Sequence, residues 1–205
     1  RMPAANQPAF NDAMQAMGSL DEGALQRLAS MLKPAGQGDN TTVEYALNGF
    51  AGYVMQAGKE AWRSRCVEAY GHALAAVTDA AGRQFLIRQL ELMGKDDAIP
   101  FLTPFLNDDT LAHPAAQALA TIGTPAARQA LTGALDHATT ATRGALVQAL
   151  GDCRASEAAA RIAPMARSND TLLRKASLYA LANIGAPASA TVLKDAASRT
   201  GYHYS

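Results

Sequence analysis

The side chains that most often carry catalysis or bind metals are few in this sequence and are spread along it. No two histidines are four residues apart, no histidine is followed by glutamate, and no Cys-x-x-Cys pair occurs. Zinc sites depend on such close ligand spacings, and so do histidine–glutamate iron sites. The sequence therefore predicts neither a metal site nor a cofactor. The histidines and cysteines of the chain are His72, His113, His137, His203, Cys66 and Cys153.

A nucleophilic active site is not predicted either. No Gly-x-Ser-x-Gly motif frames a serine, and Gly36-Gln-Gly38 lacks the Gly-Lys-Ser/Thr that completes a phosphate-binding loop. Cys66 falls on an apolar helical stripe, where a cysteine is usually a small buried hydrophobe. Cys153 lies in a turn without a neighbouring base to activate its thiol. We therefore expect a protein that is not an enzyme.

Composition narrows the choice of partner. Lys and Arg number 18, Asp and Glu also number 18, and the net charge is zero. Nucleic-acid binding normally requires a basic face, and binding to anionic lipid also requires positive charge, so we expect neither. No apolar run approaches the roughly 20 residues of a membrane-spanning helix, so membrane insertion is not expected. The composition therefore disfavours nucleic acid and membranes as partners.

Two interleaved patterns recur about every 30 residues, which is typical of repeat proteins. The first is a stripe of small and larger apolar residues at i, i+4 and i+8, which marks one face of a helix. The second is an apolar helical end followed by glycine, a residue that often closes a helix in the left-handed conformation. The stripes are Ala98–Leu102–Leu106, Ala127–Leu131–Leu135, Ala158–Ile162–Ala166 and Ser189–Leu193–Ala197, and the glycines are Gly94, Gly123, Gly151 and Gly185.

Each repeat thus reads as a first helix, a short turn, a second helix and a glycine. Such a pair cannot bury both helices alone, and stacked copies share a continuous core. We predict one all-α solenoid domain over residues 1–205, with about five helix pairs and a terminal helix. Its parts are N-terminal helices in 9–56, a pair with a long first helix in 59–94, and regular repeats in 97–197.

Local signals suggest where some helices begin. Ser19 and Glu22 have the spacing of a capping box, and Asp39-Asn40 precedes a second apolar pattern. Pro125 and Pro187 are predicted at first helical positions, where the missing N–H of proline does no harm.

The segment from Leu173 to Gly185 resembles the second helix of HEAT-like repeats of the phycobilisome-lyase type. The segment from Leu111 to Gly123 is similar, although Ala112 stands where that family prefers arginine. Residues 82–94 and the DDAIPFLTPFLNDD that follows resemble HEAT arrays of large bacterial envelope proteins. The resemblance implies a right-handed α-α superhelix of the HEAT/armadillo-like kind, and a periplasmic or secreted location, with the cytoplasm as the alternative.

The resemblance also implies a binding surface, because the second helices of HEAT repeats line the concave side of the array. In helix 171–184, Lys175 and Tyr179 lie opposite the apolar arc. The spacing between successive repeat glycines gives the equivalent positions in earlier repeats. The predicted binding residues are Arg88, Glu91, His113, Gln117, Gln148, Lys175 and Tyr179.

Three functions are compared on this basis. The first is a non-catalytic protein-interaction or scaffolding module within a larger bacterial envelope protein. The second is a chromophore-handling enzyme similar to a bilin lyase, and the third is a HEAT-type DNA glycosylase, which the charge balance disfavours. We also expect self-association through the C-terminal end, since helix 187–198 carries a first-helix stripe and no second helix follows it.

Overall fold

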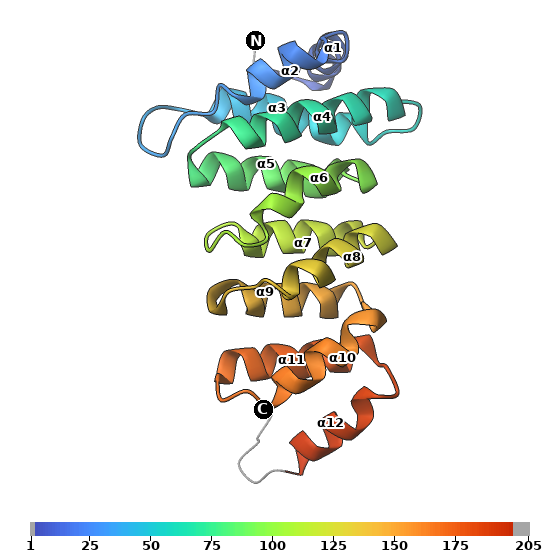
Figure 1. The fold of residues 1–205 in the computed structure, drawn as a ribbon. Coiled ribbons are helices and arrows are strands. Elements are labelled where there is room, and N and C mark those ends of the chain that lie inside the picture. The colour runs from blue at the N-terminus through green and yellow to red at the C-terminus, as the bar shows by residue number, and fades with distance from the viewer. Residues whose placement is uncertain (1–2, 199–205) are drawn as a thin grey trace. The chain divides into compact units, whose positions relative to one another are not determined.

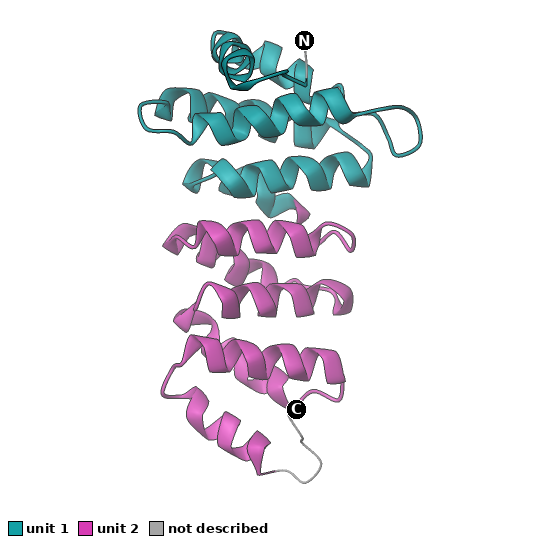
Figure 2. Cartoon of the chain, turned by 180° about the vertical axis from the view of Figure 1, so that it is seen from behind, with its two compact units in different colours: residues 1–104 teal, residues 105–205 magenta. Residues whose placement is uncertain are grey.

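The structure is a computed structural model that describes residues 3–198. In this range the chain forms twelve α-helices and four short 3₁₀ segments, and no β-strand. The predicted all-α fold is therefore confirmed. The chain divides into two compact units, residues 1–104 (unit 1) and 105–205 (unit 2), which Figure 2 draws in teal and magenta.

Unit 1 is organised around one long helix, α4. The long first helix predicted at 59–79 corresponds to α4, whose Cys66, Tyr70 and Leu74 are fully buried. The Tyr70 hydroxyl donates a hydrogen bond to the carbonyl of Leu47, 3.0 Å away, so even the polar atom of this core residue has a partner. Helix α4 contacts α2, α3, α5 and α6. The helices are α1 (Gln7–Gly18), α2 (Glu22–Ala29), α3 (Thr41–Val54), α4 (Glu60–Ala76), α5 (Ala80–Met93) and α6 (Ile99–Leu102).

An aromatic cluster joins α1, α3 and α4. Trp62 of α4 stacks on Tyr53 of α3, with ring centroids 6.4 Å apart and planes inclined by 27°. The ammonium of Lys59 lies 4.3 Å from the centroid of the Tyr53 ring, within the range of a cation–π contact. The indole also lies against Gly18, where a Cβ atom would approach it to 2.4 Å. Only a glycine at this end of α1 leaves room for the indole in its present position.

Unit 2 is a stack of helix pairs. Figure 1 shows α7, α9 and α11 side by side, with α8, α10 and α12 in a second layer. Helix α9 contacts α7, α8 and α11, and its Leu146 and Leu150 are fully buried. The helices are α7 (Ala112–Ile122), α8 (Pro125–Leu135), α9 (Thr140–Asp152), α10 (Ala159–Ile162), α11 (Thr171–Ile184) and α12 (Ser189–Ala197).

Two of the predicted first helices are not continuous. The segment around 98–106 forms 3₁₀ (Asp96–Ala98), α6 and 3₁₀ (Thr103–Phe105), and the segment around 158–166 forms 3₁₀ (Ser156–Ala158), α10 and 3₁₀ (Ala163–Arg167). Pro104 and Pro164 explain the interruptions, because a proline inside a helix removes a hydrogen-bond donor. The predicted stripes are nevertheless buried in order, so the repeat register was right and only the helix type was wrong. The buried stripe residues are Ala98, Leu102, Leu106, Ala158, Ile162 and Ala166.

Two of the predicted helix starts, at Ser19 and Pro187, need correction. Ser19 is the C-cap of α1, and Asp21 caps α2 by accepting a hydrogen bond from the backbone N–H of Ala24 at 2.7 Å. Helix α3 begins directly after Asp39-Asn40, as predicted, and the Asn40 amide bonds the backbone of Lys33 across the preceding loop. Pro187 precedes α12 by two residues and is not its first residue. Pro125 begins α8 as predicted.

The four glycines that follow the predicted second helices have three different structural roles. Gly123 and Gly185 close α7 and α11 in the left-handed conformation, with φ of 64° and 65°, as predicted. Gly94 closes α5 in an extended conformation, so its predicted left-handed cap is wrong. Gly151 lies inside α9, where a Cβ atom would sit 2.6 Å from the Cα of Ala180 in α11. Here glycine is required by the close approach of two helices and not by a turn.

We expect Gly151→Ala to destabilise the protein by about 1–3 kcal/mol, because the new methyl group would push α11 away from α9. Urea unfolding followed by circular dichroism measures this loss. Gly144→Ala in the same helix is the matched control, since no atom lies within 4 Å of its added Cβ. The control should gain about 0.5–1 kcal/mol from the better helix propensity of alanine. Equal gains for both variants would contradict the assigned contact.

A partly buried ion pair connects α4 to the 3₁₀ segment Asp96–Ala98, which follows α5. The guanidinium of Arg63 donates to the Asp97 carboxylate at 2.7 Å and to the carbonyl of Met93 at 3.0 Å. The two paired side chains are only 10% and 26% exposed. Partial burial alone would raise the pKa of Asp97, but the hydrogen bonds from Arg63 and from the backbone N–H of Lys95 outweigh it. The pKa of Asp97 therefore lies below its usual value of 3.8.

This lowered pKa makes part of the stability depend on pH. The contribution is fully present above pH 3.8 and disappears as the pH falls through the lower pKa of folded Asp97. For Asp97→Asn we expect a lower free energy of unfolding at pH 7 than for the wild type. On acidification the variant should lose less of this free energy, so the values for the two proteins should converge at low pH. Urea titrations at a series of pH values test this. Asp12→Asn, on the exposed surface of α1, is the matched control and should leave the free energy of unfolding at pH 7 nearly unchanged.

Candidate functional site

The three histidines within the described residues are exposed and lie on different parts of the chain. His72 lies in unit 1, and His113 and His137 lie in unit 2. His203 falls outside the described residues. The Nδ1 atom of His72 lies 3.1 Å from a carboxylate oxygen of Glu22, which accounts for its one polar contact. Among residues 3–198 no three His, Cys, Asp or Glu side chains converge in a way that could hold a metal ion. Within the same range, no helix is both long and apolar enough to cross a membrane.

Both cysteines are free thiols, and neither is activated. Burial raises the pKa of the Cys66 thiol to about 12, so almost none of it is the reactive thiolate at neutral pH. Cys153 is half-buried at the end of α9, and burial raises the pKa of its thiol as well. These environments are typical of inert cysteines.

The structure brings three of the predicted binding residues together. Gln148 of α9, with Lys175 and Tyr179 of α11, lines a groove of about 330 Å³ that Ala176 completes (the α9/α11 groove). All three side chains are exposed. Arg88 and Glu91 lie on α5 in unit 1, and His113 and Gln117 lie on α7. These four do not line the α9/α11 groove.

A second groove adjoins the first on the other side of Tyr179. It has a volume of about 340 Å³ and lies between α11 and α12 (the α11/α12 groove). Lys175 and Tyr179 line both grooves, so the two form one continuous surface of unit 2. The rest of the lining is aliphatic: Leu178, Ala182, Leu193, Ala196 and Ala197.

Loose docking of α12 creates the second groove. Helix α12 contacts α11 and the 3₁₀ segment Ala163–Arg167, and Figure 1 shows it running obliquely to α11. Ser189 is the only residue of α12 that is buried, whereas Val192 and Leu193 remain half-buried. A first-helix stripe that elsewhere packs into the core is therefore only partly covered here.

The Tyr179 side chain is held in place although it is 50% exposed. Its hydroxyl donates a hydrogen bond to Oδ1 of Asp152, 3.0 Å away at the end of α9. Asp152 was not among the predicted binding residues, because the 34-residue spacing between Gly151 and Gly185 makes position 145, and not 152, equivalent to Tyr179. The sequence did contain a signal for Asp152, because this residue directly follows Gly151, one of the four repeat glycines. An aromatic ring fixed in this way loses little further freedom when a partner packs on it.

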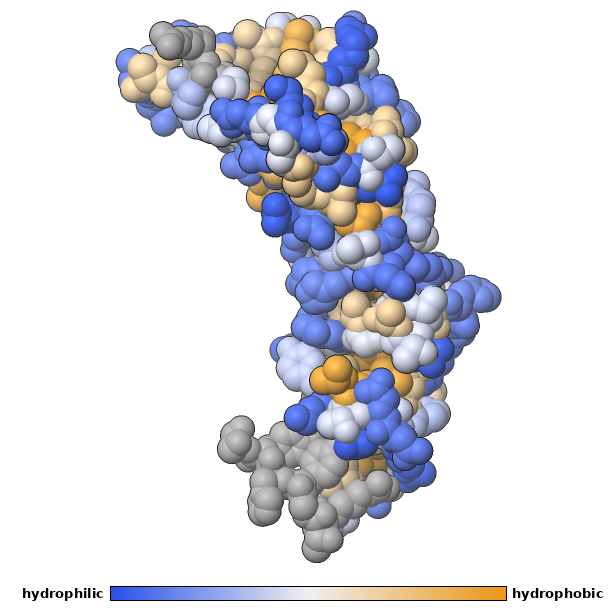
Figure 3. Space-filling view, turned by 90° about the vertical axis from the view of Figure 1, so that its left-hand side faces the viewer, coloured by the Kyte–Doolittle hydropathy of each residue, from blue (hydrophilic) through white to orange (hydrophobic). Residues whose placement is uncertain are grey.

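Hydrophobic side chains are otherwise scattered over the surface. On the face that Figure 3 shows, orange patches are small and are separated by blue and white residues. The most exposed large hydrophobic residue of the described chain is Leu172, at the start of α11. Single exposed apolar residues are normal, so the paired grooves are the more informative feature of the surface.

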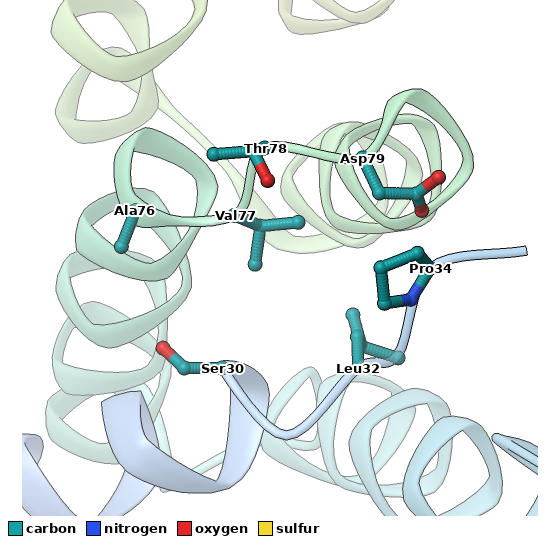
Figure 4. Close-up of a pocket in the computed structure, with 7 residues that line it drawn as sticks. All are labelled: Ser30, Leu32, Pro34, Ala76, Val77, Thr78 and Asp79. Carbon is teal, nitrogen blue, oxygen red and sulfur yellow. The ribbon is translucent and has the colours of Figure 1, made fainter. Parts of the chain in front are cut away.

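Unit 1 contains a smaller pocket of about 190 Å³ near the turn between α4 and α5 (Figure 4). The only charged group of its lining, the Asp79 carboxylate, already has a hydrogen-bond partner. The Asp79 carboxylate accepts a hydrogen bond from the N–H of Gly82 at 2.7 Å, and Arg83 donates to the carbonyl of Val77 at 2.6 Å. We therefore place the candidate site in unit 2. The lining residues of the smaller pocket are Ser30, Leu32, Pro34, Ala76, Val77, Thr78 and Asp79.

Comparison with known families agrees with this architecture. The family of HEAT repeats matches residues 68–151 and again residues 134–203, which together are more than half of the chain. The protein therefore belongs to the HEAT repeats family, and its fold is an all-α HEAT/armadillo-like solenoid. A search of curated proteins found no match. The resemblance stated from residues 173–185 and 111–123 is thus confirmed at the level of HEAT-like repeats.

We expect the two thiols to differ strongly in reactivity. In the native protein at pH 8, Ellman's reagent should modify Cys153 slowly, because it is half-buried, and should leave Cys66 unmodified. Both thiols should react in denaturant. Mass spectrometry of the modified peptides distinguishes them, and rapid modification of Cys66 in the native state would show that the core around α4 opens readily.

Proposed function

We propose that this protein is a non-catalytic interaction module that binds another protein on the surface formed by α9, α11 and α12. One observation carries the proposal: Gln148, Lys175 and Tyr179 meet around two adjoining grooves in a chain built from HEAT repeats. Solenoids of this kind present surfaces made by stacking, and proteins use them to bind partners.

The composition of this surface suits a protein partner. Tyrosine is among the residues that contribute most to binding energy, and Tyr179 lies between an apolar groove and a more polar one. Aliphatic side chains provide area that a partner can remove from water, while Lys175 and Gln148 provide polar contacts at its edge. A hydrophobic centre with a polar rim is the usual anatomy of a protein–protein interface.

Site-specific photo-crosslinking in the native host tests the proposal. A photoreactive phenylalanine derivative replaces Ala182, which is exposed and lines the α11/α12 groove. We expect a discrete protein adduct after irradiation. The same group at Gln129, exposed on α8 and outside both grooves, is the control and should give none. Adducts from position 129 alone, or from neither position, would contradict the proposed surface.

A further inference from the structure

We propose that the two grooves bind an internal peptide segment of a partner in which a bulky apolar residue lies next to Asp or Glu. This inference rests on the proposed function and specifies the chemistry of the partner. It follows from three features of the surface. These are the aliphatic lining of the α11/α12 groove, the cation Lys175 at its edge, and the more polar α9/α11 groove beyond Tyr179.

The seat for the apolar side chain is the α11/α12 groove. Five of its seven lining residues are aliphatic, and Leu178 forms its buried floor while Leu193 of α12 forms a half-buried wall. Covering these carbons would complete the burial that the shallow docking of α12 leaves unfinished. Burial of apolar surface stabilises a complex by about 25 cal/mol per Å² before the costs of association. A branched aliphatic or aromatic side chain therefore fits this groove better than a polar one.

The carboxylate follows from the charge at the rim. Lys175 is the only charged residue among those that line the two grooves, and it forms no ion pair with any described residue. Two acidic residues beside this surface have partners other than Lys175. Asp152 accepts the hydrogen bond from Tyr179, and Asp195 of α12 pairs with Arg167 at 3.5 Å. A partner carboxylate next to the apolar residue would thus meet a cation that no described carboxylate pairs with.

The α9/α11 groove beyond Tyr179 indicates that the bound peptide of the partner crosses the surface and does not end at the α11/α12 groove. Tyr179 lines both grooves, so a segment seated between α11 and α12 continues across the ring towards Gln148 of α9. A glutamine amide carries both donors and an acceptor, and can therefore bond the N–H and C=O of a passing backbone. For this reason we assign an internal segment and not a terminal carboxylate.

Selection from a display library of random decapeptides on the full chain tests the inference. We expect the enriched peptides to share an apolar residue next to Asp or Glu. For a synthetic peptide with the enriched sequence, Tyr179→Ala should weaken binding by about tenfold, as loss of an aromatic anchor does. Lys175→Glu should weaken binding by about fivefold to tenfold, because an exposed attraction becomes a repulsion. A peptide with lysine in place of the acid should recover binding to Lys175→Glu.

Lys194→Glu is the matched control, because Lys194 is exposed on α12 but lines neither groove, and it should leave binding unchanged. Circular dichroism shows whether each variant keeps its fold. Enriched peptides without an acidic residue would overturn this inference, and so would binding that Lys175→Glu leaves unchanged. In either case the interaction module proposed above would stand. If no peptide is enriched, or if the chain associates only with itself and peptides do not compete, this inference fails, and photo-crosslinking from position 182 decides the interaction module separately.

Discussion

The close approach of α9 and α11 at Gly151 and Ala180 is the contact on which unit 2 depends. A Cβ atom at position 151 would lie 2.6 Å from the Cα of Ala180, so the backbones nearly touch at this point. Such proximity places the end of α9 beside the middle of α11, and the hydroxyl of Tyr179 then reaches Asp152 at 3.0 Å. The same approach brings Gln148 next to Lys175. A spacing set by two small residues thus determines the surface that we assign to binding.

Much of this fold was predictable, because periodic burial is a property that sequence records directly. The stripe residues Leu102, Leu131 and Ile162 are all fully buried, as their spacing indicated. Helix continuity was harder to predict, since it depends on competition between local propensity and packing. Pro104 and Pro164 interrupt hydrogen bonding, while tertiary burial keeps the stripes in register. Caps were also misassigned where several polar residues compete, as at Ser19 and Asp21.

The candidate site was predictable only in part. The face of α11 opposite its apolar arc correctly identified Lys175 and Tyr179 as exposed, because helical geometry fixes which side chains share a side. The α11/α12 groove could not be found in this way. Leu193 belongs to a regular first-helix stripe, and the sequence alone does not reveal that α12 docks too shallowly to bury it. Whether Arg88, Glu91, His113 and Gln117 contribute to binding remains a prediction.

The aromatic cluster of unit 1 has a spectroscopic consequence. Trp62 is the only tryptophan of the chain, and it stacks on Tyr53 beside the ammonium of Lys59. Indole emission therefore reports on unit 1 alone, whereas far-ultraviolet circular dichroism reports on the helices of both units. In a repeat array each element contacts mainly its neighbours, and a single cooperative transition is not guaranteed. Comparing the two signals during denaturation would show directly whether the solenoid melts as one body or from one end.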